Sequence, residues 1–231
     1  FGGNAEEKHR YIGARVSEDQ QFLVLSASNT TSGNKLFVKD LSNPQANFIA
    51  IVDHEDSDTS VIENLGSTLY LLTNLNAPNQ KIVTVNASDP TPAHWVDLIP
   101  ETEYVLSPNT GGGYFFAEYM VNAISKVLQY DYSGNLIREV ELPGVGSVSG
   151  FGGKKEEQEF YFNFTNYSTP ATAYKYHTET GKSSLYWKPT IDFNPEAYTS
   201  EQVFYTSKDG TQVPMIITYK SGLALTGKNR S

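Results

Sequence analysis

The sequence predicts an all-β protein, a β-propeller of about four four-stranded blades, and three observations lead to this class. Short runs rich in Val, Ile, Leu, Tyr and Phe alternate with clusters of Gly, Pro, Asn, Asp and Ser, which is the pattern of strands and turns. No stretch keeps apolar residues at helical spacing for more than about two turns. The strongest strands also recur with a period of about 46 residues, which is typical of a propeller blade.

Two independent landmarks in the sequence give this period. The first is a strongly hydrophobic strand whose starting positions lie 47, 45 and 46 residues apart: 22–26, 69–73, 114–118 and 160–164. The second is the strand that follows it and ends in a turn, with last residues 46, 45 and 46 positions apart: 37–40, 82–86, 127–131 and 174–177. A β-sandwich would not keep so strict a period, so the propeller is favoured.

Weaker strands complete each unit to four. One precedes the strong strand, at 11–16, 59–64, 103–106 and 147–151, and another closes the unit, at 48–52, 94–98, 137–142 and 184–187. These strands predict blades at about 10–54, 55–100, 101–144 and 145–195. The chain then departs from the repeat with a hairpin, 202–206 and 213–218, around an Asp209-Gly210 turn. We expect residues 196–231 to begin a second domain.

Composition excludes several function classes. Among 231 residues, 17 Lys and Arg stand against 26 Asp and Glu, a net charge of −9 that argues against a nucleic-acid partner. No apolar run approaches the roughly 18–20 residues that span a bilayer, so no membrane partner is expected. The absence of cysteine excludes disulfides, thiolate zinc sites and a cysteine nucleophile. It is compatible with a cytoplasmic or a periplasmic location.

The chain shows no constellation that would carry catalysis. Its four histidines are scattered without metal-ligand spacing. The acidic segment Asp53–Asp58 offers oxygen ligands but lacks the glycine and final glutamate of an EF-hand, so a solvated loop between blades is favoured over a calcium site. The nearest approach to a nucleophile elbow, Gly146–Gly150, has the wrong spacing. We therefore predict no catalytic residue, no metal and no cofactor within this chain.

Several segments carry a more specific signal. Thr73–Lys81 reads T-N-L-N-A-P-N-Q-K, and Trp95–Glu101 reads W-V-D-L-I-P-E. Phe164–Pro170 reads F-T-N-Y-S-T-P, and Glu201–Thr211 reads E-Q-V-F-Y-T-S-K-D-G-T. These segments resemble the prolyl oligopeptidase family of serine peptidases, and the resemblance extends over nearly the whole chain. Three of them resemble propeller segments of that family: Thr73–Lys81, Trp95–Glu101 and Phe164–Pro170. Glu201–Thr211 resembles the family's entry into the hydrolase domain.

The resemblance implies a seven-bladed propeller that caps an α/β-hydrolase domain. The four repeats would be the C-terminal part of that propeller, and the chain would stop before the family's catalytic triad. We therefore expect a truncated piece of a serine-type oligopeptidase that is inactive alone. The propeller would gate the access of short proline-containing peptides to the active site. The family's outer substrate subsites align with Tyr11, Ser28 and Thr31, although a strand-end tyrosine and two loop hydroxyls explain these residues equally well.

Two other functions fit the same repeats. One is a non-enzymatic propeller that acts as a binding scaffold, because fold alone does not fix function. The other is a related oligopeptidase with dibasic or acylaminoacyl specificity, against which the T-N-x-x-A-P-N match argues. Four repeats form either a small closed ring or an arc of a larger one. An arc cut from a seven-bladed ring would expose two blade faces, so self-association through those faces is expected.

Overall fold

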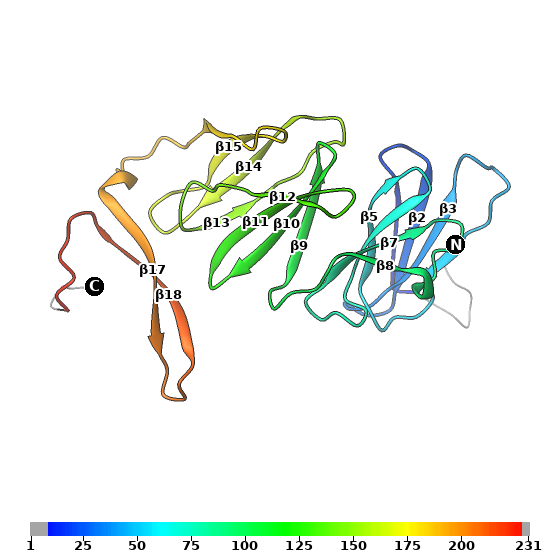
Figure 1. The fold of residues 1–231 in the computed structure, drawn as a ribbon, viewed down its shortest axis with the longest axis horizontal. Coiled ribbons are helices and arrows are strands. Elements are labelled where there is room, and N and C mark those ends of the chain that lie inside the picture. The colour runs from blue at the N-terminus through cyan, green and yellow to red at the C-terminus, as the bar shows by residue number, and fades with distance from the viewer. Residues whose placement is uncertain (1–8, 228–231) are drawn as a thin grey trace. The chain divides into compact units, whose positions relative to one another are not determined.

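The computed structural model describes residues 9–227, which form β-strands joined by turns and loops, with almost no helix (Figure 1). Within this range there are eighteen strands and two three-residue 3-10 helices, η1 (Pro92–His94) and η2 (Pro195–Ala197). The same range holds no helix with the length and hydrophobicity needed to cross a membrane. The prediction of an all-β protein is confirmed.

The chain divides into two compact units. The first contains the residues up to Thr110 together with the turn Tyr132–Asn135, and the second contains Gly111–Asp131 and the residues from Leu136 onward. Sixteen strands form four sheets of four, and the last two strands form a separate hairpin. In every sheet the strands that follow each other in sequence lie side by side, so each sheet is a meander as in a propeller blade.

The first two sheets follow the predicted repeat closely. The first comprises β1 (Tyr11–Val16), β2 (Phe22–Ser28), β3 (Lys35–Asp40) and β4 (Ile49–Val52). The second comprises β5 (Thr59–Leu65), β6 (Thr68–Thr73), β7 (Lys81–Asn86) and β8 (Val96–Ile99). The pairs within both sheets are antiparallel, and a register shift interrupts the last pair of each.

The remaining elements repeat the same plan and then leave it. The third sheet comprises β9 (Leu106–Gly111), β10 (Tyr114–Val121), β11 (Ile124–Asp131) and β12 (Leu136–Glu139). The fourth comprises β13 (Ser147–Ser149), β14 (Glu159–Thr165), β15 (Thr172–His177) and β16 (Ser183–Trp187). The final hairpin pairs β17 (Tyr198–Thr206) with β18 (Gln212–Lys220) across the predicted Asp209-Gly210 turn.

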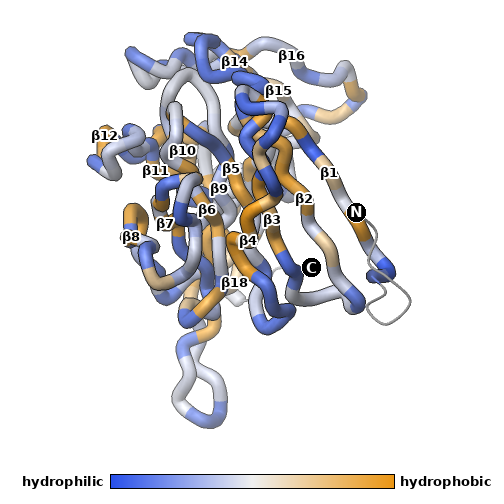
Figure 2. The backbone as a smooth tube through the Cα atoms, turned by 90° about the vertical axis from the view of Figure 1, so that its right-hand side faces the viewer, coloured by the Kyte–Doolittle hydropathy of each residue, from blue (hydrophilic) through white to orange (hydrophobic). Residues whose placement is uncertain are grey.

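Alternation of side chains decides which faces of the sheets are buried. Along β14, Phe160, Phe162 and Phe164 are buried while the residues between them are exposed, the period of two expected of a strand covered on one face. Along β6, Leu69, Tyr70 and Leu71 are all buried, because this sheet is covered on both faces. Figure 2 shows most of the hydrophobic residues in the strands and many hydrophilic ones in the connections.

Each unit has its own hydrophobic core. In the first unit, mainly aliphatic residues of the first two sheets pack together: Phe22, Val24, Leu36, Val38, Ile51, Val52, Val61, Leu69, Leu71, Val83, Val85 and Ala87. In the second unit, mainly aromatic residues of the third and fourth sheets form the core: Phe116, Val127, Val140, Val148, Phe151, Phe160, Phe162, Phe164 and Tyr176. Burial of these faces is the main favourable term that joins each pair of sheets.

One predicted strand is wrong and another is shifted. The prediction of a strand at 103–106 fails because β9 begins only at Leu106. The hydroxyl of Thr102 donates to the Tyr104 carbonyl at 3.0 Å and accepts from the Tyr104 amide at 3.1 Å, which closes a local turn instead. His94, predicted to start a strand, lies in η1, and β8 starts at Val96.

Candidate functional site

Two of the three predicted substrate-binding residues lie side by side at one end of the first sheet. Tyr11 begins β1 and Ser28 ends β2, and their Cα atoms are direct partners in the antiparallel register. The amide of Arg10 donates to the carbonyl of Ser28 at 3.0 Å, which extends this pairing beyond the strand. Tyr11 is 55% exposed, so its side chain is open to a ligand.

The two loop hydroxyls differ in their surroundings. Ser28 is buried, and its hydroxyl donates to the carbonyl of Thr30 at 2.7 Å. That hydroxyl therefore shapes the loop that follows β2. Thr31 lies three residues further along, in the exposed part of the same loop. The structure thus brings Tyr11 and Ser28 together and places Thr31 on the loop that leads from them.

This loop, residues 29–34, is held by the acidic segment Asp53–Asp58, for which the sequence predicts only a solvated loop. Glu55 accepts hydrogen bonds from the backbone amide and the side-chain amide of Asn29, at 3.1 and 2.9 Å. The Oδ1 atom of Asp58 accepts from the amide of Gly33 at 2.7 Å. The segment 53–58 does connect two sheets, from β4 of the first to β5 of the second, as predicted. Two of its carboxylates, however, bind the neighbouring loop.

Gly33 makes this close approach possible. It has a φ of 76°, a conformation that glycine adopts without strain. A Cβ atom at this position would lie 1.9 Å from the carbonyl oxygen of Glu55. The next residue, Asn34, accepts from the Thr59 amide at 2.9 Å and donates to the Thr59 carbonyl at 3.0 Å. Two features of the sequence could have indicated this arrangement: the turn residues Ser32-Gly33-Asn34 and the acidic segment Asp53–Asp58 that follows.

The acidic segment has no geometry suited to a metal. Within residues 9–227, no group of three or more His, Cys, Asp or Glu side chains is placed to hold an ion. Glu55 and Asp58 each receive N–H donors on both carboxylate oxygens. Asp56 is 87% exposed and lies 3.5 Å from the ring of His54. The donor pattern therefore fits a structural clamp rather than a cation site.

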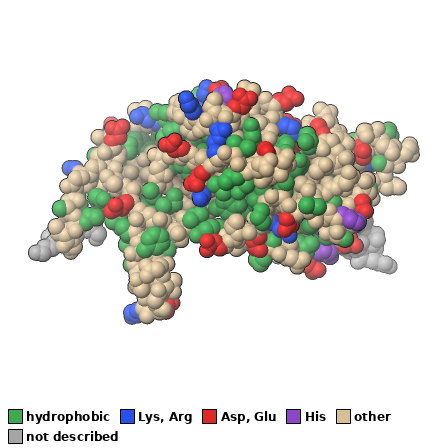
Figure 3. All heavy atoms as spheres, viewed as in Figure 1, with side chains coloured by type: hydrophobic (Ala, Val, Ile, Leu, Met, Phe, Trp, Pro, Cys, Tyr) green, Lys and Arg blue, Asp and Glu red, His purple; other side chains and the backbone are tan. Residues whose placement is uncertain are grey.

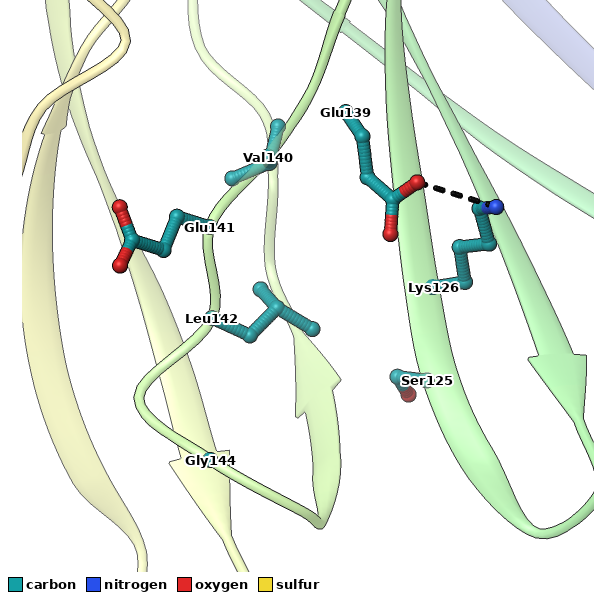
Figure 4. A pocket seen from close by; sticks show the side chains of 7 residues that line it. All are labelled: Ser125, Lys126, Glu139, Val140, Glu141, Leu142 and Gly144. Carbon is teal, nitrogen blue, oxygen red and sulfur yellow. Dashed lines mark ion pairs between the residues drawn. The ribbon is translucent and has the colours of Figure 1, made fainter.

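A cavity of about 340 Å³ on the third sheet is the other candidate for a site (Figure 4). Its lining includes Ser125, and a 3.0 Å ion pair joins Lys126 to Glu139. The hydroxyl of Ser125 donates to Glu118 at 3.0 Å and accepts from the amide of Val148 at 3.1 Å. This serine is 4% exposed and fully engaged, so it does not resemble an activated nucleophile.

A buried carboxylate, that of Glu63, lies on β5 in the first unit. Glu63 accepts a hydrogen bond from the hydroxyl of Tyr132 at 3.2 Å, and the hydroxyl of Tyr70 donates to the carbonyl of Tyr132 at 3.1 Å. Burial, with the charge of Glu63 as a second cause, raises the pKa of Tyr132 far above its usual value. This tyrosine therefore stays neutral and serves to fasten the turn Tyr132–Asn135 to the first unit.

Comparison with known proteins decides the family. Residues 2–189 match the family described as "Prolyl oligopeptidase, N-terminal beta-propeller domain". The chain belongs to the prolyl oligopeptidase family. It is 52% identical over 227 residues to the prolyl endopeptidase of Elizabethkingia meningoseptica, a match that covers 98% of this chain and 32% of that relative. The chain thus spans about a third of the length of the curated relatives it matches.

Solved structures agree with this assignment to the prolyl oligopeptidase family. Apo prolyl oligopeptidase B from Galerina marginata superposes with a TM-score of 0.85 at 29% identity, covering 96% of this chain and 33% of that one. Further structures of that protein hold peptides described as a 25mer macrocyclization substrate and a 35mer hydrolysis and macrocyclization substrate. The blade architecture and the family resemblance are confirmed, and relatives in the family act on peptides.

Proposed function

We propose that this chain is part of the propeller of a prolyl-specific serine oligopeptidase, whose catalytic triad lies in a hydrolase domain outside these 231 residues. The observation that carries the proposal is the 52% identity to a prolyl endopeptidase over 98% of the chain. The four sheets fit blades at about 10–54, 55–100, 101–144 and 145–195, the C-terminal part of a seven-bladed propeller. The family match ends at residue 189, which is consistent with 196–231 beginning the hydrolase domain.

The role proposed for the propeller is to control which peptides reach the active site. A closed ring of blades admits extended short peptides and excludes folded proteins. Tyr11, Ser28 and Thr31, at one end of the first sheet, would contribute to the outer subsites for such peptides. The exposure of Tyr11 and Thr31 supports this role, whereas Ser28 acts through the loop that its hydroxyl shapes.

Enzyme assays test the proposed activity. The purified 231-residue chain should hydrolyse no Gly-Pro chromogenic substrate, and the complete protein should cleave it after proline. Turnover by the 231-residue chain that survives a serine-directed inhibitor and repurification would contradict the proposal. A complete protein that binds peptides without cleaving them would favour the scaffold alternative. Cleavage after basic pairs or release of acylated residues, without cleavage after proline, would favour the related oligopeptidases.

The exposed face of the fourth sheet supports self-association of the isolated chain. Large side chains of this sheet are strongly exposed, Leu185 on the opposite face from Tyr161: Tyr161 49%, Leu185 53%, Tyr186 64% and Trp187 57%. The rings of Tyr161 and Tyr186 lie 4.5 Å apart between centroids, so they form one apolar surface. We expect a dimer or larger oligomer in light scattering at about tens of micromolar, and a strict monomer would contradict it.

Nucleic acid and membranes are not among the proposed partners. In Figure 3, Lys and Arg side chains are scattered among Asp and Glu rather than gathered into a stripe. The chain carries a net charge of −9, which repels phosphate backbones. The peptide is therefore the partner to test first.

A further inference from the structure

The carboxylate of Glu55 contacts both segments that carry the proposed subsite residues. On one side it accepts the two hydrogen bonds from Asn29, the residue after Ser28. On the other side its Oε1 atom lies 3.8 Å from Nδ1 of His9, two residues before Tyr11. The side chain of His9 is only 3% exposed, so this contact is shielded from solvent. One side chain thus lies between the start of β1 and the loop after β2.

Asp58 binds the far end of the same loop and is itself bound by Asn74, which follows β6 in the second sheet. While Oδ1 receives the Gly33 amide, Oδ2 accepts from the side-chain amide of Asn74 at 3.1 Å. The amide of Asp58 donates back to Oδ1 of Asn74 at 2.7 Å. Asn74 is the second residue of the Thr73–Lys81 segment. Asn74, in the segment that resembles the family, therefore holds the carboxylate of Asp58, which in turn binds Gly33 of the loop 29–34.

On the basis of the function proposed above, we propose that Glu55 and Asp58 are positioning residues for peptide recognition. They hold residues 29–34 against the start of β1, and so set the distance between Tyr11 and Thr31. Hydrogen bonds from N–H groups to a carboxylate are stronger than those between neutral groups. Together with the hydrogen bonds between Asn34 and Thr59, they tie this short loop, with its glycine in the left-handed region, to the adjacent blade.

The donor pattern makes nearly isosteric substitutions informative. Both oxygens of Glu55 and both oxygens of Asp58 accept hydrogen bonds from N–H groups. An amide at either position has one acceptor oxygen and one NH2 donor, so only one of the two N–H groups that donate to the carboxylate keeps an acceptor there. Glu55→Gln and Asp58→Asn therefore weaken the clamp with almost no change in volume. Asp56→Asn, in the same segment but 87% exposed, is the matched control.

Hydrogen exchange in the 231-residue chain tests the clamp without any assay of activity. The Asn29 and Gly33 amides donate directly to the two carboxylates. We expect their exchange to become about ten-fold faster, Asn29 in Glu55→Gln and Gly33 in Asp58→Asn, with Asp56→Asn unchanged. Exchange of these two amides that stays at the unaltered rate in both variants would overturn the clamp.

Steady-state kinetics of the complete protein test the role in recognition. For a longer peptide that reaches the outer subsites, we expect KM to rise about three- to ten-fold with kcat unchanged, as for a loss of uniform binding. A dipeptidyl chromogenic substrate, too short to reach the loop, should keep its KM. Gly33→Ala should reproduce the KM effect with both charges intact, because its Cβ atom displaces the loop.

The outcomes separate this inference from the proposed function. If the unaltered complete protein cleaves after proline but no variant changes KM for the longer peptide, the positioning role is wrong and the function stands. A fall in kcat for both substrates would indicate general damage and would also overturn the positioning role. If the unaltered protein cleaves no peptide after proline, the proposed function fails, and the substrate role of the loop fails with it.

Discussion

The cores of the two compact units are built from different side chains on the same four-stranded plan. In the first unit, Val, Leu and Ile residues of two sheets interdigitate, with Phe22 as the one phenylalanine of the cluster. In the second unit, five phenylalanines and Tyr176 fill the same kind of interface. The repeat therefore specifies the strands but not the type of side chain in the core. Aliphatic and aromatic side chains alike bury the apolar face that a blade must cover.

The aromatic core depends on ring geometry as well as on burial. Phe116 meets Phe160 edge-on, with centroids 5.0 Å apart and planes at 83°. Phe151 stacks on Phe162 at 4.4 Å and 14°. Edge-to-face and offset stacked arrangements add to the energy of burial, and they also restrict which side chains can replace a ring. The second unit should therefore tolerate substitution less well than the first.

Truncation of one residue in each core gives the largest expected effect. Phe116→Ala should lower the free energy of unfolding by about 3–5 kcal/mol, and Leu71→Ala by about 2–5 kcal/mol with a smaller cavity. Both residues are fully buried, so exposure does not bias the comparison. Urea denaturation of the 231-residue chain measures both losses. A larger loss for Leu71→Ala than for Phe116→Ala would contradict the ranking.

A single buried hydroxyl, that of Tyr176, should also stabilise the aromatic core of the second unit. Tyr176 donates to Oε1 of Gln129 at 2.7 Å, and Nε2 of Gln129 donates to the carbonyl of Thr178 at 2.9 Å. Tyr176→Phe keeps the ring and leaves that amide oxygen buried, which should cost about 1–3 kcal/mol. The double variant with Gln129→Leu should recover part of the loss. Equal stability of Tyr176→Phe and the unaltered chain would show that packing alone carries this core.

Alkaline pH should destabilise the second unit through its buried tyrosines. Burial, followed by the charge of Tyr130, raises the pKa of Tyr119 from 10.0 to about 12. Burial is likewise the first cause of the raised pKa values of Tyr130, Tyr174 and Tyr176 in the same unit. Above pH 10 the unfolded chain releases these protons first, so stability falls between pH 10 and about 12.

Substitution of Tyr119 measures its share of that loss. The Tyr119→Phe variant should lose less free energy of unfolding than the unaltered chain when the pH rises from about 9 to about 11. Tyr161→Phe is the control, because Tyr161 is 49% exposed. An identical pH dependence for Tyr119→Phe and the unaltered chain would show that Tyr119 does not hold its proton in the folded state.

The sequence predicted the blades well because period and alternation are both local signals. The predicted strand 11–16 matches β1 residue for residue, and the predicted 46-residue steps recur in the four sheets. The strand expected at 103–106 failed because a side-chain turn at Thr102 competes with strand pairing, and hydrophobicity does not report such turns. Residues whose environment depends on the fold, such as the pair Phe116 and Phe160, were not predictable as partners.

The candidate site was predictable only in part. The resemblance to the family indicated Tyr11, Ser28 and Thr31, and strand pairing then brings the first two together. Glu55 and Asp58 could not be assigned to the loop from sequence, because 26 and 25 residues separate them from Asn29 and Gly33. An acidic run looks the same in sequence whether its carboxylates face water or backbone amides, so only the fold distinguishes the two.

Exposed ion pairs should give the smallest effect and should not distinguish the units. Lys81 pairs with Asp97 at 2.7 Å between β7 and β8, and Lys126 pairs with Glu139 at 3.0 Å between the equivalent strands β11 and β12. All but Lys81 are substantially exposed, so removal of either lysine should cost at most about 0.5–1 kcal/mol. Urea denaturation of Lys81→Met and Lys126→Met measures both. Nearly equal losses would locate the difference between the units in their cores, whereas a loss at Lys126 that rivals Tyr176→Phe would place part of it on the surface.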